Sequence, residues 1–170
     1  METLSVRVIG AGLAGSEAAL QLASFGLKVE LYEMRPGKQT PAHKGGNLAQ
    51  LVCSNSFKGL SLTSAHGLLK NELKMLGSFL LQIAEKTSVP AGESLTVNRD
   101  LFSEEVEKLI LSTPNITLHR EEVQSLEGNL PTIVAAGPLA SDTLADDIFK
   151  RLGSERLHFF DAIAPVVETD

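Results

Sequence analysis

The alternation of apolar and polar residues predicts a βαβ unit at the start of the chain. Residues 4–9 and 28–32 alternate as short strands do, and residues 16–26 between them have helical periodicity. The side of this helix expected to face the core carries Ala18, Leu22 and Phe25. Strand, helix and strand in this order are typical of a parallel sheet.

The same reasoning predicts three more helices and several short strands. Residues 64–86 are expected to form one helix, because leucines and Ile83 recur every three or four positions as a core-facing stripe. Its lysines, Lys70 included, are expected on a solvated face. The other helices are expected near Asn98, with Asn98 or Asp100 as the cap, and after Ser141, with Ser141 as the cap. Strands are expected at residues 95–97, 116–119, 121–126 and 132–137.

Residues 34–47 break the periodic pattern. They are rich in proline, glycine and polar residues, which predicts a long loop. Loops of this length inside compact domains are usually functional or disordered. His43 in this loop is interpreted as solvated, with contact to a substrate as the alternative.

A glycine pattern joins the first strand to the first helix. The complete G-x-G-x-x-G motif consists of Gly10, Ala11, Gly12, Leu13, Ala14 and Gly15. Its first glycine permits a tight turn, its second leaves room for a pyrophosphate, and its third lets the helix pack closely on the sheet. The helix start offers unpaired N–H groups and a partial positive charge. In this context the motif predicts a site for the adenosine end of FAD or NAD, with a ligand-free turn as the alternative.

An acid at the end of the second strand narrows the choice of cofactor. Glu33 is placed to accept hydrogen bonds from ribose hydroxyls, and its charge disfavours a 2′-phosphate, so FAD or NAD is expected rather than NADP. Arg35 is expected either to contact adenine or a phosphate, or to be a solvated loop residue.

Composition limits the remaining possibilities. The chain has 170 residues, which suggests one domain, and 43% hydrophobic and 21% charged residues, which is ordinary for a globular protein. The sequence contains no run of 18 apolar residues, so no membrane span is expected. The first predicted strand begins too close to the N-terminus to leave room for a signal peptide. A net charge of −6 argues against a large basic face. One cysteine and scattered histidines indicate a reducing cytoplasm and no metal site. Because no capping signal follows residue 165, we expect the N-terminal portion of a longer protein.

The opening unit, followed by the Ala-Ala-Gly end of residues 132–137, resembles flavoproteins of the glutathione-reductase type. The resemblance implies an α/β, Rossmann-like FAD-binding domain over residues 1–170, with a doubly wound parallel sheet and an inserted loop and helix at about residues 36–95. It also implies that Ala136 and Gly137 lie near FAD and that Val123 meets adenine through its backbone.

A sharper resemblance rests on motifs that follow one another from residue 5 to the end of the chain. They are GAGLAGSEAA at residues 10–19, YEMRP at 32–36, TPAH at 40–43, LVCSNS at 51–56, VPAG at 89–92 and AGPL at 136–139. Together they are similar to the TrmFO family of FAD- and folate-dependent tRNA (uracil-5-)-methyltransferases. Leu13 and Ser16 stand where the related GidA proteins are expected to carry His and Cys, which favours TrmFO. Through the YEMRP motif, Met34 and Arg35 join the expected cofactor-binding residues.

The resemblance implies a chemistry. Methylenetetrahydrofolate donates a one-carbon unit, reduced FAD carries it or supplies electrons, and NADH or NADPH reduces the flavin again. The product is 5-methyluridine in the T-loop of tRNA. The alternatives are methylation of a ribosomal RNA uridine, another FAD- or NAD-linked oxidoreductase, and a non-catalytic nucleotide-binding fragment.

Cys53 is the candidate catalytic residue. Addition of a thiolate to C6 of uracil gives an enolate whose C5 can attack a one-carbon electrophile. Such a thiol has to be accessible. The alternative is a buried structural cysteine. The family has a second cysteine that this chain lacks, so the sequence leaves open which of the two is the nucleophile.

Overall fold

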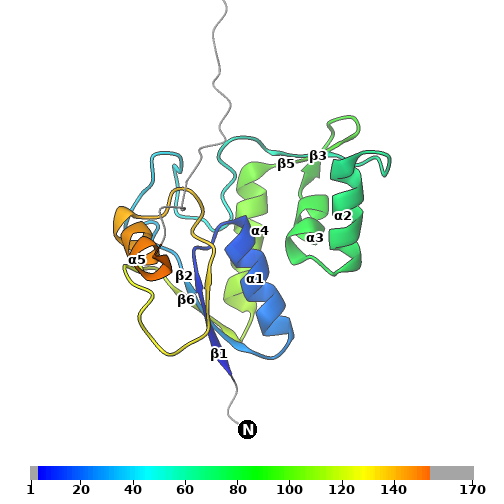
Figure 1. Ribbon diagram of the computed structural model, residues 1–170. Coiled ribbons are helices and arrows are strands. Elements are labelled where there is room, and N and C mark those ends of the chain that lie inside the picture. The colour runs from blue at the N-terminus through cyan, green and yellow to red at the C-terminus, as the bar shows by residue number, and fades with distance from the viewer. Residues whose placement is uncertain (1–3, 154–170) are drawn as a thin grey trace, which may run out of the picture.

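A four-stranded parallel sheet forms the centre of the molecule (Figure 1). The computed structural model describes residues 4–153. The strand order is β6-β2-β1-β7, and the strands are β1 (Ser5–Ile9), β2 (Lys28–Tyr32), β6 (Ile116–His119) and β7 (Thr132–Val134). Each neighbouring pair runs parallel. The α/β architecture expected from the sequence is confirmed.

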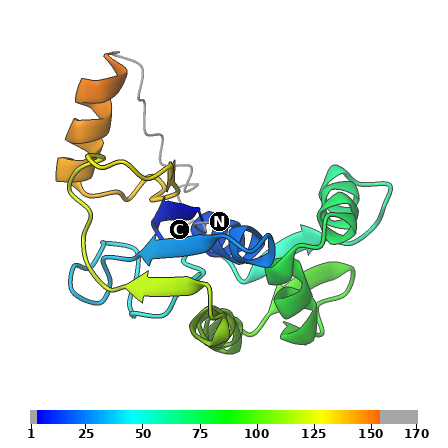
Figure 2. The same cartoon turned by 90° about the horizontal axis from the view of Figure 1, so that it is seen from below.

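The two faces of this sheet differ in chemistry, because side chains alternate along each strand. One face buries Val8 and Leu31 completely beneath α1 (Leu13–Ser24) and α4 (Arg99–Ser112), which lie side by side (Figures 1 and 2). The opposite face carries polar pairs. Arg7 Nε donates to Thr132 Oγ1 at 3.0 Å. His119 Nε2 lies 2.6 Å from Glu30 Oε2.

A smaller antiparallel sheet is inserted between β2 and α4. Its order is β3-β5-β4, and it is accompanied by two helices; the five elements are β3 (Ser56–Gly59), α2 (Ala65–Met75), α3 (Phe79–Lys86), β4 (Ser88–Val89) and β5 (Ser94–Val97). Phe57 on β3 packs against Phe102 on α4, with ring centroids 5.5 Å apart. This contact joins the inserted unit to the core of the main sheet.

The prediction of one continuous helix over residues 64–86 is wrong, because the chain turns between α2 and α3. Gly77 adopts a left-handed φ of +77°, and the Ser78 hydroxyl accepts a hydrogen bond from Leu81 N to begin α3. The turn changes the direction of the apolar stripe. Leu80 and Ile83 are buried, whereas the upstream leucines of the stripe, Leu69, Leu73 and Leu76, are exposed.

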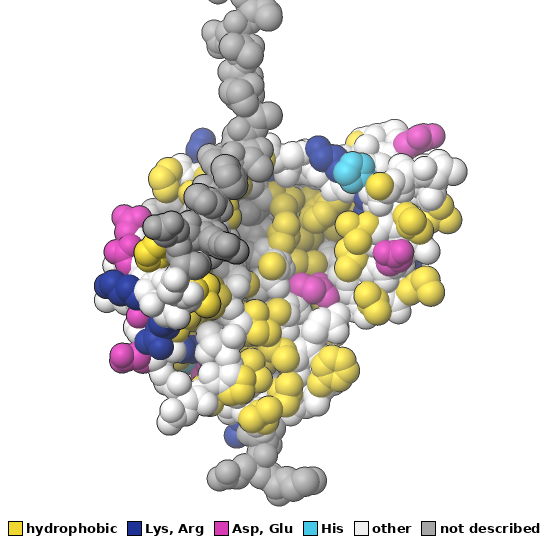
Figure 3. Space-filling model, viewed as in Figure 1, with side chains coloured by type: hydrophobic (Ala, Val, Ile, Leu, Met, Phe, Trp, Pro, Cys, Tyr) yellow, Lys and Arg dark blue, Asp and Glu magenta, His cyan; other side chains and the backbone are white. Residues whose placement is uncertain are grey.

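Apolar side chains therefore gather on the surface of the inserted unit and around a central hollow (Figure 3). The exposed residues of the unit include Leu60, Leu62, Leu68, Leu69, Met75 and Leu76. Contiguous apolar surface of this kind is typical of an interaction surface.

The predicted buried side of the first helix is only partly confirmed, because Leu22 packs half-buried against the core but Ala18 is only half-buried and Phe25 is exposed. Phe25 is 79% exposed, and the residues that α1 buries are Gly15, Ser16, Ala19, Leu20 and Ala23. The reason is the close approach of the helix to the sheet. A Cβ on Gly15 would lie 1.7 Å from the Gly10 carbonyl oxygen, so contact at Gly15 sets which side of the helix faces inward.

Residues 121–126 form no strand, contrary to prediction. Their polar groups bond to side chains instead of a neighbouring strand. Leu126 N donates to Asp147 Oδ2 at 2.7 Å, and Arg7 Nη2 donates to Leu126 O at 2.9 Å. The last helix is confirmed as α5 (Asp142–Leu152), with the Ser141 hydroxyl accepting from Leu144 N at its start.

Candidate functional site

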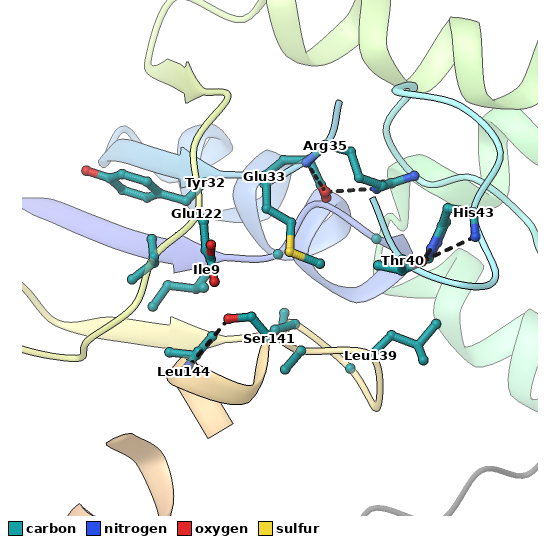
Figure 4. A pocket seen from close by; sticks show the side chains of 18 of the residues that line it. Ile9, Tyr32, Glu33, Arg35, Thr40, His43, Glu122, Leu139, Ser141 and Leu144 are labelled. Atoms are coloured by element: carbon teal, nitrogen blue, oxygen red, sulfur yellow. Dashed lines mark hydrogen bonds and ion pairs between the residues drawn. The ribbon is translucent and has the colours of Figure 1, made fainter. Parts of the chain in front are cut away.

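A cavity of about 370 Å³ opens at the carboxyl ends of β1 and β2. One wall is the glycine turn and the end of β2, and the opposite wall is the segment from Ala135 to Leu144 (Figure 4). In Figure 4, Glu33 and Arg35 lie across the cavity from Leu139 and Ser141, while Thr40 and His43 close one side. Ligands of open α/β sheets bind at this end of the strands.

The three glycines of the motif meet different constraints. Gly10 has φ +95°, and a Cβ there would lie 2.6 Å from Ala136 Cα. Gly15 packs against the Gly10 carbonyl, as described above. A Cβ on Gly12 would meet no atom within 4 Å, and Gly12 lines the cavity. Packing therefore demands glycine at Gly10 and Gly15, whereas Gly12 keeps open space at the start of α1.

Four of the six motif residues line the cavity, namely Gly10, Gly12, Leu13 and Ala14. Ala11 and Gly15 are buried behind them. Ala11 acts through Glu33, because its amide donates to Glu33 Oε2 at 3.1 Å and so holds a carboxylate that does line the cavity.

Glu33 and Arg35 form a buried ion pair beside the glycine turn. Arg35 Nε donates to Glu33 Oε1 at 2.8 Å, and Arg35 N donates to the same oxygen at 3.0 Å. Glu33 is 5% exposed and Arg35 2% exposed, so the interpretation of Arg35 as a solvated loop residue is wrong. Arg35 is buried because it has a carboxylate partner two residues away.

The pKa of Glu33 reflects two opposing influences. Burial acts to raise it, but the hydrogen bonds and charge of Arg35, together with the Ala11 amide, outweigh burial and hold this pKa below the ordinary value. Glu33 is therefore ionised at neutral pH and presents an acceptor to the cavity.

His43 and Thr40 form a second polar pair in the cavity wall. His43 Nδ1 lies 2.5 Å from Thr40 Oγ1, and His43 N donates to that hydroxyl oxygen at 3.2 Å. Burial lowers the pKa of His43, and the charge of Arg35 lowers it further. His43 is half-buried and lines the cavity, so it is not the freely solvated loop residue that the sequence indicated, and its imidazole is neutral at neutral pH.

The remaining predicted cofactor residues also meet at this cavity. Met34, Val123, Ala136 and Gly137 all line it. Gly137 has a left-handed φ of +67°, which turns the chain from β7 toward α5. The ion pair of Lys38 with Glu122, 2.8 Å long, ties the long loop to the wall that contains Val123.

Cys53 is exposed, so the buried structural interpretation is wrong. It does not line the cavity, although its neighbour Val52 does.

Lys70 was predicted to lie on a solvated helix face, and this prediction is wrong as well. Lys70 is 9% exposed, and its Nζ donates to Phe57 O and His66 O. Burial lowers its pKa.

Several lining residues have no role in the site expected from the sequence, including Thr40, Gln50, Leu139, Ser141 and Leu144. The sequence identifies Ser141 only as a helix cap, and the signal for Thr40 is its place in the TPAH motif. Within residues 4–153, no group of three or more His, Cys, Asp or Glu side chains is arranged to hold a metal ion. No helix in this range has the length and apolar character needed to cross a membrane.

Residues 5–170 match the family model described as "Glucose inhibited division protein A". Two solved structures share the fold. Aquifex aeolicus GidA superposes with a TM-score of 0.68 at 18% identity, covering 88% of this chain and 31% of that one. The GidA-related protein from Thermus thermophilus gives a TM-score of 0.50 at 16% identity, covering 89% of this chain and 69% of that one.

Curated relatives are more similar in sequence. Methylenetetrahydrofolate–tRNA-(uracil-5-)-methyltransferase TrmFO of Lactobacillus delbrueckii subsp. bulgaricus is 52% identical over 168 residues, 99% of this chain and 38% of the relative. TrmFO of Aquifex aeolicus is 54% identical over 165 residues, 97% of this chain and 37% of the relative. The similarity to TrmFO inferred from the motifs is confirmed, and the chain spans about two fifths of the length of these relatives.

Proposed function

Because this chain belongs to the glucose-inhibited division protein A family, we propose that it is the flavin-binding portion of an FAD- and folate-dependent tRNA (uracil-5-)-methyltransferase. The sequence identity to proteins named TrmFO supports the choice within the family. Since the chain spans about two fifths of those relatives, the methylation itself is proposed for the whole enzyme.

The observation that carries the proposal is the cavity between the glycine turn and Glu33. Gly12 leaves open space at the N-terminus of α1, where helix amides and the helix dipole favour a pyrophosphate. Leu13 and Ala14 line the cavity in the first turn of the same helix. We assign these residues to the pyrophosphate of FAD.

Glu33 fits the adenosine ribose. Its Oε1 already accepts two hydrogen bonds from Arg35, whereas Oε2 accepts one from Ala11. A carboxylate oxygen has two lone-pair positions, so Oε2 keeps one for a ribose hydroxyl. We assign the adenine to the wall that contains Val123, and Ala136 and Gly137 to the opposite side of the cofactor.

The proposed chemistry combines this site with Cys53. Bound FAD would supply electron transfer, with NADH or NADPH as the reductant and methylenetetrahydrofolate as the one-carbon donor. The thiolate form of the exposed Cys53 adds to C6 of the target uracil, and the electron pair moves to C5, which attacks the methylene carbon of the folate as one of its C–N bonds breaks. Loss of the C5 proton then expels the remaining folate nitrogen and leaves an exocyclic methylene at C5. Bound FAD, reduced by NADH or NADPH, would supply the hydride equivalent that converts this methylene to a methyl group, and the C6–S bond breaks to release Cys53 as thiolate. We further propose a cytoplasmic location, in keeping with one cysteine in the sequence.

Two measurements test the proposal on the full-length enzyme. The purified protein is expected to show flavin absorbance, and a protein that cannot be loaded with FAD would exclude both this function and the oxidoreductase alternative. Tritium release from C5-labelled uridine in T-loop RNA, dependent on methylenetetrahydrofolate and NAD(P)H, is then expected. Release from ribosomal RNA alone would transfer the activity to that substrate. No release from either RNA by FAD-loaded enzyme would favour the oxidoreductase.

The cofactor assignment has its own test. Glu33→Gln is expected to weaken FAD binding by about 1–3 kcal/mol, because a charged acceptor for a buried hydroxyl is lost. Glu30→Gln is the matched control, since Glu30 lies on β2 three residues before Glu33, pairs with His119 and does not line the cavity. If the two variants bind FAD with equal affinity, the assignment of Glu33 to the ribose is wrong.

A further inference from the structure

We infer that Arg120 and Glu107 are positioning residues that hold the long loop against the cofactor cavity. Neither residue lines that cavity. Both are tied to the loop by hydrogen bonds, and we call this pair the loop clamp. The inference rests on the proposed function, because the ligand whose affinity the clamp sets is FAD.

The loop needs such support because it has no regular structure of its own. No helix or strand covers residues 33–55, yet this stretch supplies Thr40, His43 and Gln50 to the cavity wall. A wall of this kind keeps its shape only where its backbone is fastened to rigid elements.

Arg120 fastens both ends of the loop at once. Its Nη1 donates to Arg35 O at 3.1 Å and to Gly46 O at 2.5 Å, two carbonyls eleven residues apart in sequence. Its Nη2 pairs with Glu107 Oε1 at 2.5 Å. The planar fork of a guanidinium can meet three acceptors in this way, whereas a lysine ammonium is a compact point charge.

Glu107 connects the same loop to α4. Its second oxygen, Oε2, accepts a hydrogen bond from Leu48 N at 3.0 Å. The adjacent residue, Ala49, donates through its amide to Ala11 O at 2.8 Å. The clamp thereby joins α4, the segment after β6 and the loop, immediately beside the glycine turn.

The position of the clamp explains how it acts on the cavity without touching it. Arg35, whose carbonyl Arg120 holds, is the residue whose side chain pairs with Glu33. Arg35 Nη1 also donates to Gln50 at 3.3 Å across the loop. Release of the Arg35 and Gly46 carbonyls frees the loop between them to move away from the opposite wall.

Two readouts on the full chain test the clamp. Trypsin cleavage after Lys44, an exposed loop residue, reports opening of the loop without any cofactor. Titration with FAD reports the cavity. Arg120→Lys and Glu107→Gln are each expected to raise the cleavage rate at Lys44 and to weaken FAD binding by roughly tenfold, the effect of losing one charge-assisted hydrogen bond.

Glu105→Gln is the matched control. Glu105 also lies on α4 and pairs with a cation, Lys86, at 2.5 Å, but that pair does not contact the loop. This variant is expected to leave both readouts unchanged. If Arg120→Lys does not fold, Glu107→Gln decides the question, because its amide oxygen still accepts from Leu48 N.

The outcomes separate the clamp from the proposed function. Folded variants with a lower melting temperature but unchanged cleavage and FAD affinity would overturn the clamp and leave these residues a purely structural role. A parent chain that binds no FAD would overturn the cofactor assignment, while faster cleavage in the variants would still support the clamp on the loop.

Discussion

At the scale of single residues, the central feature is the buried pair of Glu33 and Arg35. The position of Glu33 was predictable, because dinucleotide-binding βαβ units carry an acid for the ribose at the end of their second strand, about 20 residues after the glycine motif. The burial of Arg35 was not, because loop arginines are ordinarily solvated. The contacts of Arg35 with Glu33 and Gln50 depend on the path of the loop. The pattern of apolar and polar residues does not predict that path.

Removal of one partner of this pair is expected to be costly. Glu33→Ala should lower the free energy of unfolding of the flavin-free chain by about 3–5 kcal/mol, because it leaves Arg35 buried without its counter-ion. The double variant Glu33→Ala/Arg35→Met should recover much of that loss. Urea denaturation of the two variants and the parent measures both effects. A double variant less stable than Glu33→Ala would contradict the explanation.

The same pair predicts a pH dependence. The pKa of Glu33 is lower in the folded state than its ordinary value of 4.5, so the unfolded chain binds more protons as the pH falls. Its stabilising contribution is full above about pH 5 and is lost as the pH drops through the folded-state pKa. The difference in unfolding free energy between the parent and Glu33→Gln should therefore be constant from pH 7 to about 5 and shrink at lower pH. A difference that grows on acidification would refute the lowered pKa.

Cys53 offers a prediction about catalysis alone. Cys53→Ala should abolish uridine methylation by the full-length enzyme, because the proposed nucleophile is lost. FAD affinity should be unchanged, because Cys53 lies outside the cavity. Methylation assays and flavin titration on the same preparation check both statements. Undiminished turnover would assign the nucleophile to another residue.

At the scale of elements, the pattern of apolar and polar residues along the sequence correctly predicted the strands of the main sheet and the helices α1, α4 and α5. The failures have physical causes. Gly77 and Ser78 divide one continuous apolar stripe into two helices, and close contact at Gly15 changes which side of α1 is buried. Residues 121–126 alternate like a strand but bond to side chains of distant elements. Such choices depend on partners that are remote in sequence.

The glycine turn gives an element-scale prediction from two matched substitutions. Gly15→Ala should destabilise the chain by about 3 kcal/mol or more, because the new Cβ would clash with the Gly10 carbonyl. Gly12→Ala should fold normally, because its Cβ meets open space, but should lose FAD affinity where the pyrophosphate is proposed to approach. Thermal melts and flavin titration distinguish the two. Equal melting temperatures for the two variants would show that the turn is less tightly packed than described.

At the scale of the whole molecule, the cavity is assembled from segments far apart in the chain. The glycine turn and Glu33 come from the opening βαβ unit, and the opposite wall from residues 135–144. The sequence predicted both walls separately. It did not predict that the loop at residues 34–47, together with Gln50 and Val52 after it, supplies the third side, because irregular segments carry no periodic signal.

A ligand that bridges these walls should stabilise the whole chain. At an FAD concentration 100 times its dissociation constant, linkage adds about 2.7 kcal/mol to the free energy of unfolding. For a chain of this size this corresponds to a rise of roughly 5–10 °C in melting temperature. Differential scanning calorimetry with and without FAD measures the shift. NADP in place of FAD is the control, and an equal shift with NADP would contradict the selectivity assigned to Glu33.

The pairing of β1 with β7 also sets an order of events during synthesis. β2 follows β1 after a single helix, so this parallel pair can form early on the ribosome, whereas β7 is more than 120 residues downstream of β1. The wall that begins with Ala135 therefore arrives last, after the inserted unit and α4 have emerged. A nascent chain arrested before residue 135 would carry the glycine turn yet hold no flavin, so cofactor capture would mark the moment when this half of the sheet closes.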